Sequence, residues 1–227
     1  MSRHPRAVFP NVPLHIIQRG NNRCPCFFSR SDYQTYVGMM SEAVQRFPCQ
    51  VHAYVLMPNH VHILTTPHAE DAPAAMIKWL SQKYVQYVNR KHVRYGTLWQ
   101  GRYRSCLVDS ERYFFVCQRY IELNPVRAAL CAHPADYDWS SYRVNAFGQD
   151  NAVVVPHSNY MALANEPLQR QARYRALFDE VITEPMIEHV RGATNSSLFF
   201  GSVAFANRMA AHFGRNATKM RAGRRND

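Results

Sequence analysis

The residues with the clearest chemical potential are two histidines, His60 and His62, within the apolar run of residues 55–64. Successive side chains of a strand alternate between its faces, so we expect both imidazoles to project side by side. Val61 and Ile63 would then point into the packed face. Neutral imidazoles paired in this way can hold a divalent metal. Two ordinary strand histidines, one exposed and one hydrogen-bonded, would show the same spacing, and the pair alone does not decide between these readings.

A tyrosine and an asparagine stand four residues apart in a predicted helix. The helix is expected to begin at Asp109-Ser110 and to end or kink at Asn124, because Pro125 disfavours the α conformation before it. Tyr120 and Asn124 would lie one turn apart on nearly the same face. A phenol can attack phosphorus if a cation, base or metal offsets its ordinary pKa of about 10, and an amide oxygen can ligate a hard metal ion. Each residue alone more often serves packing or helix termination.

The chain carries a strong positive charge. Its 227 residues include 27 Lys and Arg against 16 Asp and Glu, a formal net charge of +11. An excess of this size favours a polyanionic partner, most often nucleic acid, over an inert basic surface. The hydrophobic content of 47% is ordinary for a globular protein and argues against disorder.

The sequence predicts a cytoplasmic protein without a membrane partner. No uninterrupted apolar run reaches transmembrane length, and the first residues lack the apolar segment of a signal peptide. Six cysteines are present, and none forms a C-x-x-C pair. Without export, we expect free thiols rather than disulfides.

The remaining pattern predicts an α+β fold. Strands are expected at residues 14–19, 51–56, 60–65 and 104–108. Amphipathic helices are expected to begin at Ser31-Asp32, ending near Pro48, and at Asp71-Ala72-Pro73. The order β-α-β-β-α-β is that of a ferredoxin-like antiparallel sheet, which we expect to carry its helices on one face.

The chain changes character toward its C-terminal third. We expect one domain over residues 1–149 and a helical extension over residues 150–227. Within the extension, residues 171–190 are predicted to form a helix and residues 198–213 a second apolar segment. The tail is basic, and it could hold phosphates without sequence preference or serve only solubility. Its arginines are Arg221, Arg224 and Arg225.

Taken together and in this order, the motifs resemble a known family. Met57-Pro58-Asn59-His60-Val61-His62 resembles the HUH motif, two histidines around one hydrophobic residue. Residues 120–127, Tyr-Ile-Glu-Leu-Asn-Pro-Val-Arg, resemble the nucleophile helix of single-tyrosine HUH transposases. Three further motifs resemble those of REP-associated tyrosine transposases: Gly20-Asn21-Asn22-Arg23, Trp99-Gln100-Gly101-Arg102 and Trp139-Ser140-Ser141-Tyr142-Arg143. The resemblance covers residues 8–148.

This resemblance implies a metal-dependent endonuclease and strand transferase with an HUH core. It makes Tyr120 the nucleophile, and its attack on a phosphodiester would leave a 5′-phosphotyrosine and a free 3′-OH. The ligands of Mg²⁺ or Mn²⁺ would be His60, His62 and Asn124. Tyr113 is the fallback nucleophile. Tyr84 and Tyr87 are poorer candidates, because nothing places them on the histidine face.

The implied substrate is single-stranded DNA beside REP-type hairpins, the repetitive extragenic palindromes of bacterial genomes. Basic grooves and stacking aromatic side chains bind such strands. Motif position and charge give the expected DNA contacts, each of which could instead form a surface ion pair: Arg19, Arg23, Arg102 and Arg104. We expect a bacterial, nucleoid-associated protein that acts as a monomer or a homodimer.

Two other function classes stay open. A non-catalytic protein that binds DNA hairpins would need the basic surface, but it has no need of a histidine pair with a nearby tyrosine and asparagine. A zinc hydrolase would use the two histidines, yet no carboxylate or third histidine stands at a helpful spacing. DNA cleavage, or tightly bound zinc, would separate these hypotheses.

Overall fold

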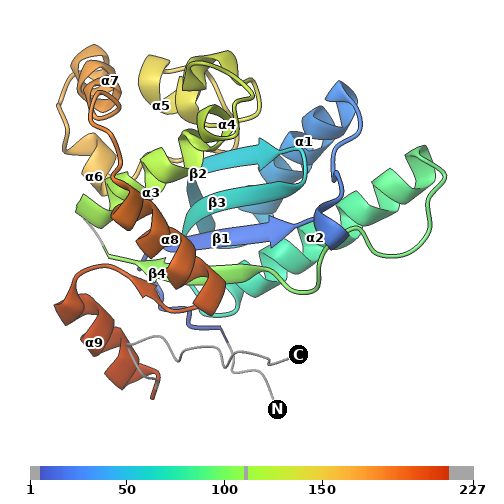
Figure 1. Cartoon of the computed structure of the whole chain (residues 1–227), viewed down its shortest axis with the longest axis horizontal. Helices are drawn as coiled ribbons and strands as arrows, with labels where there is room; N and C mark the ends of the chain where they lie inside the picture. The colour runs from blue at the N-terminus through green and yellow to red at the C-terminus, as the bar shows by residue number, and fades with distance from the viewer. Residues whose placement is uncertain (1–5, 110–111, 215–227) are drawn as a thin grey trace.

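The computed structural model describes residues 6–109 and 112–214, and its first part follows the predicted order of elements (Figure 1). These elements are β1 (Leu14–Arg19), the short 3-10 helix η1 (Asn21–Arg23), α1 (Arg30–Arg46), β2 (Cys49–Met57), β3 (His60–Pro67), α2 (Ala72–Lys91) and β4 (Arg104–Val108). The strands pair antiparallel in the order β2-β3-β1-β4. The expected ferredoxin-like arrangement is confirmed.

The register of the sheet decides which side chains share a face. Across the β1–β3 pair, Ile17 lies opposite His62 and Arg19 lies opposite His60. His15 stands two residues before Ile17 and therefore has the same orientation. One face of the sheet thus carries two histidines of β3, one histidine of β1 and a basic side chain.

Helices cover both faces of the sheet (Figure 1). α1 and α2 pack on the face of Val61 and Ile63 and form the larger apolar core. The opposite face is covered by α3 (Arg112–Glu122) and α8 (Glu184–Ser196). The α+β class is confirmed, and the two helices of the ferredoxin-like unit, α1 and α2, lie on one face as expected; α3 and α8, which follow that unit in the chain, cover the other face as well. β2 carries apolar side chains such as Ala53 and Val55 on its second face, and this face also needs cover.

The C-terminal extension adds to the same sheet. After α3 follow α4 (Asn124–Arg127), η2 (Pro134–Asp136), α5 (Tyr142–Phe147), α6 (Ser158–Met161), α7 (Pro167–Ala176), α8, β5 (Phe199–Phe200) and α9 (Val203–His212). β5 pairs parallel with β4, which has an open edge there. The expectation of a helical extension is corrected, because the extension also contains one short strand. The domain boundary at residue 149 stays a prediction, and the basic tail with its three arginines lies outside the described residues.

The prediction of a single helix over residues 171–190 is wrong, because the structure has two helices in this region. α7 ends at Ala176, and α8 begins at Glu184. Pro185 stands in the first turn of α8, where its missing amide hydrogen is tolerated. In the interior of a longer helix the same proline would break the hydrogen-bond ladder. This proline is the sequence signal for two helices.

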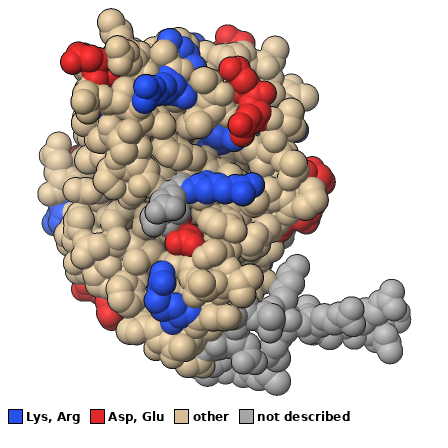
Figure 2. Space-filling model, turned by 90° about the vertical axis from the view of Figure 1, so that its left-hand side faces the viewer, with Lys and Arg blue, Asp and Glu red and all other residues tan. Residues whose placement is uncertain are grey.

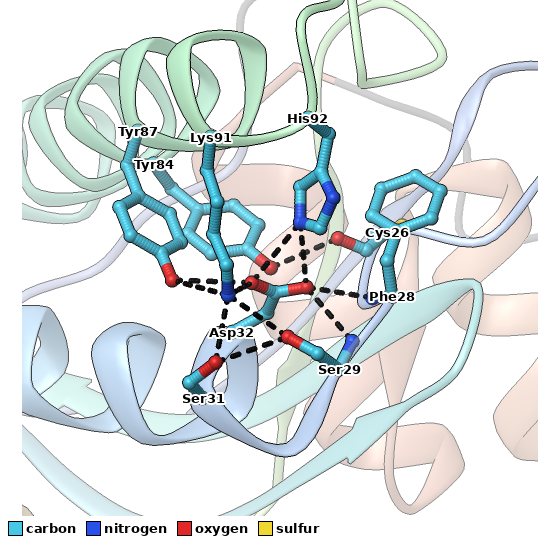
Figure 3. A network of polar contacts seen from close by, with 9 residues as sticks. All are labelled: Cys26, Phe28, Ser29, Ser31, Asp32, Tyr84, Tyr87, Lys91 and His92. Carbon is cyan, nitrogen blue, oxygen red and sulfur yellow. Dashed lines mark hydrogen bonds and ion pairs between the residues drawn. The ribbon is translucent and has the colours of Figure 1, made fainter.

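A buried polar network ties the start of α1 to the end of α2 (Figure 3). Asp32 is fully buried and accepts hydrogen bonds from the backbone amides of Phe28 and Ser29, at 2.8 and 2.9 Å. Tyr87 and Lys91 of α2 donate to the same carboxylate at 3.1 and 2.6 Å. Burial alone would raise the pKa of Asp32, but the hydrogen bonds from Lys91 and Phe28 outweigh it and hold the pKa below its usual range.

The loop between β1 and α1 packs against the tip of the β2–β3 hairpin. The amides of Gly20 and Cys26 donate to the carbonyls of Asn59 and Pro58, at 2.8 and 2.7 Å. A side chain at Gly20 would collide with the carbonyl oxygen of Cys24, so this approach requires glycine. The Gly-Asn-Asn-Arg motif therefore fixes the hairpin tip from which β3 begins.

A buried carboxyl group joins α3 to the segments that follow it. Glu122 accepts hydrogen bonds from Ser141 at 2.6 Å, Asn145 at 2.9 Å and Tyr174 at 2.6 Å. Burial raises the pKa of Glu122 to about 7, although these hydrogen bonds oppose the shift. The Trp-Ser-Ser-Tyr-Arg motif thus supports the helix that carries Tyr120.

Two expectations from composition concern membranes and thiols. Within residues 6–109 and 112–214, no helix combines the length and apolar character that crossing a bilayer needs. All six cysteines are free thiols, as predicted. Four of them are buried, where a thiol packs as a small apolar side chain: Cys26, Cys49, Cys106 and Cys117.

Candidate active site

β3 presents both histidines of the motif on the face under α3 and α8. The ring centroids of His60 and His62 lie 5.0 Å apart. His62 is buried and His60 partly buried. Val61 and Ile63 pack in the opposite core. The structure therefore has the two imidazoles side by side, as the spacing predicts.

A hydrogen bond to Asn59 fixes the protonation of His60. Nδ1 of His60 lies 2.6 Å from Oδ1 of Asn59. The side-chain nitrogen of Asn59 donates to the carbonyl oxygen of Arg23 at 3.1 Å, which leaves Oδ1 as the acceptor. Nδ1 of His60 must then carry the proton, and Nε2 keeps its lone pair.

A third histidine, His15 of β1, completes the group, although it belongs to none of the sequence motifs. Its Nε2 atom lies 2.8 Å from Nδ1 of His62, and the two rings stack with centroids 5.0 Å apart. The signal for it is positional, because His15 and Arg19 are four residues apart on one strand and share a face. That signal acquires meaning only once β1 is known to pair with β3.

Burial keeps these imidazoles neutral. It lowers the pKa of His15 to about 3 and the pKa of His60 to about 4, with the Arg19 charge adding to the shift at His60. The pKa of His62 falls well below its ordinary value, first through burial and then through the neighbouring His60. A neutral imidazole is the form that binds a metal ion.

α3 brings Tyr120 onto the histidines. Its ring centroid lies 5.8 Å from that of His62 and 6.0 Å from that of His15, and both contacts are edge-on. Only 6% of Tyr120 is exposed. Burial raises the pKa of the phenol above its ordinary value, whereas the charges of Arg127 and Arg191 oppose this shift. Ionisation of the phenol therefore depends on positive charge gathered at this site.

Arg127 is a second site residue to which the sequence pattern gives no role of its own. Its guanidinium carbon lies 4.3 Å from the centroid of the Tyr120 ring, and Nη2 donates to the Tyr120 carbonyl at 2.6 Å. Nη1 is buried and has no hydrogen-bond partner among the described residues. A buried guanidinium with a free N–H group can receive an anionic oxygen, such as that of a phosphate. The short helix α4 places this residue, and its course could not be read from the motif.

Asn124 closes the C-terminal end of α3. Its side-chain nitrogen donates to the carbonyls of Tyr120 and Ile121, at 3.0 and 3.3 Å. The amide oxygen takes no part in these bonds. α3 ends at Glu122, two residues from the position that Pro125 predicts. In the described part of the chain, no hydrogen bond joins Asn124 to either histidine of β3.

The three other candidate tyrosines have different surroundings. The ring of Tyr113 packs on Phe200, with centroids 5.2 Å apart. Tyr84 is buried in the core beneath α2, and Tyr87 donates to Asp32 in the network of Figure 3. Among the four, Tyr120 is the tyrosine whose ring contacts His62.

Two of the arginines expected to contact DNA lie on the histidine face. Arg19 is the cross-strand neighbour of His60, and Arg104 begins β4 on the other side of β1. Nη1 of Arg104 donates to Oδ1 of Asn195 in α8, at 2.9 Å. The extension therefore reaches a residue that we expect to bind DNA.

Arg23 ends the short helix η1 and Arg102 lies on a loop, and both are exposed at the same end of the sheet. The Arg23 carbonyl accepts from Asn59, and Gln100, two residues before Arg102, donates its amide to the Arg19 carbonyl at 2.7 Å. None of the four predicted arginines forms an ion pair with an acidic side chain of residues 6–109 or 112–214. The surface-ion-pair alternative thus finds no support in the structure.

The molecule has a different surface on the side shown in Figure 2. There, Lys and Arg are interspersed with Asp and Glu across a mostly uncharged surface. The described atoms of this side form no continuous basic patch. The positive charge of the chain is therefore not concentrated on this side.

The residues present fit a divalent metal ion. Nδ1 of both β3 histidines is engaged, so Nε2 is the atom left to face a ligand, and Asn124 offers an amide oxygen. No three His, Cys, Asp or Glu side chains of the described chain form a group that could hold a metal by themselves. Within the described residues, a third ligand would therefore be of another kind, such as this amide oxygen.

Comparisons with known proteins bear on the family and the fold of this chain. Residues 8–124, more than half of the chain, match the family model of IS200-like transposases. A Haemophilus influenzae protein assigned as a REP-associated tyrosine transposase is 23% identical over 111 residues, which cover 44% of this chain and only 63% of that relative. The solved structure of a REP-associated tyrosine transposase bound to a REP hairpin has the same fold, with a TM-score of 0.56 and 18% identity over 69% of this chain and 93% of that chain. The chain belongs to the IS200-like transposase family.

Proposed function

We propose that the chain is a metal-dependent endonuclease and strand transferase that cleaves single-stranded DNA beside REP-type hairpins. The observation that carries the proposal is the contact between the Tyr120 and His62 rings, with centroids 5.8 Å apart. His60 and the guanidinium of Arg127 adjoin this contact. A tyrosine that served packing alone would have no need of buried histidines and a guanidinium with a free Nη1 group around it.

The proposed metal ligands are His60, His62 and Asn124, with Mg²⁺ or Mn²⁺ as the ion. When bound, the ion would supply neutralisation of the charge that develops on the scissile phosphate. All three donors are neutral, so they leave the positive charge of the site intact for an anionic substrate. Nη1 of Arg127 would donate to a non-bridging phosphate oxygen.

The proposed nucleophile is Tyr120. Its phenol loses a proton and attacks phosphorus, the bond between phosphorus and the 3′-oxygen breaks, and that oxygen takes a proton to become a free 3′-OH. The phosphate stays on the tyrosine as a 5′-phosphotyrosine diester. Because the diester energy is retained, attack by another 3′-OH releases the tyrosine and joins two strands without ATP.

The proposed partner is hairpin DNA of the REP type. The relative of known structure is bound to a REP hairpin, and this chain has a net charge of +11. Four arginines at the site end of the sheet form no ion pair with an acidic side chain of the described residues, and they would contact the phosphates. They are Arg19, Arg23, Arg102 and Arg104. Nucleoid association, and action as a monomer or a homodimer, belong to the same proposal.

Denaturing gels test the enzyme directly. The full chain is incubated with labelled single-stranded hairpin DNA from palindromes flanking its gene, in Mg²⁺ or Mn²⁺ or in EDTA. We expect a covalent adduct that requires metal, disappears in Tyr120→Phe and persists in the matched control Tyr113→Phe. The control removes a hydroxyl from the same helix at a position that contacts Phe200 instead of the histidines.

Three outcomes would overturn parts of this proposal. Tight hairpin binding without an adduct in either metal would favour a non-catalytic hairpin-binding protein. An adduct that forms in Tyr120→Phe at the normal rate would reject the nucleophile. Tightly bound stoichiometric zinc in the purified protein would favour a zinc hydrolase.

A further inference from the structure

A line of hydrogen bonds runs from His62 into the C-terminal extension. Nδ1 of His62 lies 2.8 Å from Nε2 of His15, and Nδ1 of His15 lies 3.0 Å from Oγ1 of Thr194 in α8. The Thr194 hydroxyl donates to the carbonyl oxygen of Val190, 2.8 Å away. His15, His62 and Thr194 are each at most 3% exposed, so the line lies in the protein interior.

The carbonyl group at the end of this line determines which atom donates and which accepts in every hydrogen bond of the line. A carbonyl oxygen can only accept, so the Thr194 hydroxyl proton points to Val190. Oγ1 of Thr194 is then the acceptor for His15, and Nδ1 of His15 carries the proton. A neutral imidazole protonated at Nδ1 has its lone pair on Nε2, which accepts from Nδ1 of His62. His62 is left with an unprotonated Nε2.

The groups beside this line do not reverse these donor and acceptor roles. Sγ of Cys106 lies 3.3 Å from Oγ1 of Thr194, and burial raises the pKa of this thiol to about 12. The thiol keeps its proton and can donate to the second lone pair of Thr194. A histidine that binds a metal ion is neutral, and in the neutral form neither imidazole has a second N–H group that would compete.

We propose that His15 and Thr194 are positioning residues that hold His62 in the tautomer whose Nε2 is free to bind a metal ion. Outer partners of metal-ligating histidines fix the tautomer and the ring orientation in this way. The proposal rests on the proposed function in one respect, because it takes His62 as a ligand. The tautomer itself exists without metal or DNA. Since Thr194 and Val190 belong to α8, the extension completes the site.

NMR of the full metal-free chain measures the tautomer. Histidine is labelled with ¹⁵N, and the signals of interest are assigned by their loss in His15→Gln and His62→Gln. We expect both rings to show a protonated Nδ1 and an unprotonated Nε2 at neutral pH. A protonated Nε2 on His62 in the wild-type chain would overturn the proposal.

Thr194→Val removes the hydroxyl and keeps the shape of the side chain. We expect His62 to populate the tautomer protonated at Nε2, and Mn²⁺ affinity measured by EPR to fall about 10-fold or more. Thr194→Ser keeps a hydroxyl and should restore both properties. Thr66→Val is the matched control, because Oγ1 of Thr66 lies 2.8 Å from Nε2 of buried His52 outside the site. It should change neither property.

These measurements separate the positioning role from the proposed enzyme activity. An unchanged tautomer and unchanged Mn²⁺ affinity in folded Thr194→Val would overturn the positioning role. If this variant does not fold, the tautomer of His62 in the wild-type chain still tests the proposal. Absence of DNA cleavage in a chain with the expected tautomer would count against the proposed function alone.

Discussion

The two faces of the sheet bury very different side chains. The face under α1 and α2 is closed by apolar residues such as Leu56, Ile63 and Leu80. The face under α3 and α8 also has an apolar core, yet it buries His15 and His62 beside Tyr120. Polar groups are buried on the first side too, where Asp32 lies between α1 and α2, but only the second face brings histidines and a tyrosine together among the described residues.

Such groups are costly unless each has a partner. Burial of an unpaired polar group costs about 1–3 kcal/mol in proteins. We call the face under α3 and α8 the polar face. There, Asn59, the neighbour of His60 in the sequence, is the hydrogen-bond partner of His60, whereas Thr194 of the extension is the partner of His15. The first face supplies stability through apolar burial, and the second is arranged for chemistry with help from distant parts of the chain.

The largest expected effect of breaking the polar face comes from His60→Ala. We expect adduct formation with hairpin DNA to slow about 1,000-fold, because loss of a ligand removes roughly 4 kcal/mol of transition-state stabilisation. The free energy of unfolding should change by less than about 1 kcal/mol, since His60 is only partly buried. Single-turnover gels and urea unfolding measure the two quantities. Loss of folding with unchanged cleavage per folded molecule would assign His60 to structure instead.

Two buried titratable groups near α3 should affect stability with opposite dependence on pH. His52 contacts Phe114, and burial lowers its pKa from 6.5 to about 4. The unfolded chain therefore binds more protons, and this contribution to stability is lost as the pH falls from 6.5 toward 4. The pKa of Glu122 is raised from 4.5 to about 7, so its contribution is present below pH 4.5 and is lost as the pH rises through 7.

Urea unfolding between about pH 4.5 and pH 7.5 should resolve both groups, each worth up to about 3 kcal/mol. We expect His52→Gln to flatten the loss of stability in acid and Glu122→Gln to steepen it. Glu42→Gln is the control on the α1 side, because Glu42 pairs with Lys83 at an exposed position. Parallel profiles for all four proteins would contradict the burial of these two groups.

A smaller effect, confined to stability, is expected for Val61→Ala. Val61 is adjacent to both histidines in sequence, but it packs in the core on the opposite face. Its truncation should lower the free energy of unfolding by about 2 kcal/mol and leave cleavage per folded molecule within about twofold. Calorimetry and single-turnover gels test this pair of results. A loss of cleavage as large as that of His60→Ala would show that the two faces cannot be separated.

Local patterns in the sequence predict the ferredoxin-like core well. Alternating apolar runs predict β1 and β3, and the His-x-His spacing predicts that His60 and His62 share a face. Pro125 predicts the end of α3 to within two residues. These features depend on residues that are close to one another in the chain, and the types and spacing of such residues can be read directly from the sequence.

The rest of the site depends on contacts between distant segments. His15 becomes a partner of His62 only through the β1–β3 register, and Thr194 reaches it only because α8 crosses the sheet (Figure 1). Arg127 reaches Tyr120 through the course of α4. β5 has two residues, too few to show a period. None of these positions has a local signal that separates it from an ordinary surface or core residue.

The most direct test of Tyr120 as the DNA-linked residue is mass spectrometry of the covalent adduct. Trypsin cleaves after Arg112, Arg119 and Arg127, so Tyr113 and Tyr120 fall in separate peptides, residues 113–119 and 120–127. After nuclease digestion, we expect the nucleotide remnant on the peptide of residues 120–127, with fragmentation assigning it to Tyr120. A remnant on Tyr113 or on any other residue would contradict the placement of the chemistry beside His62.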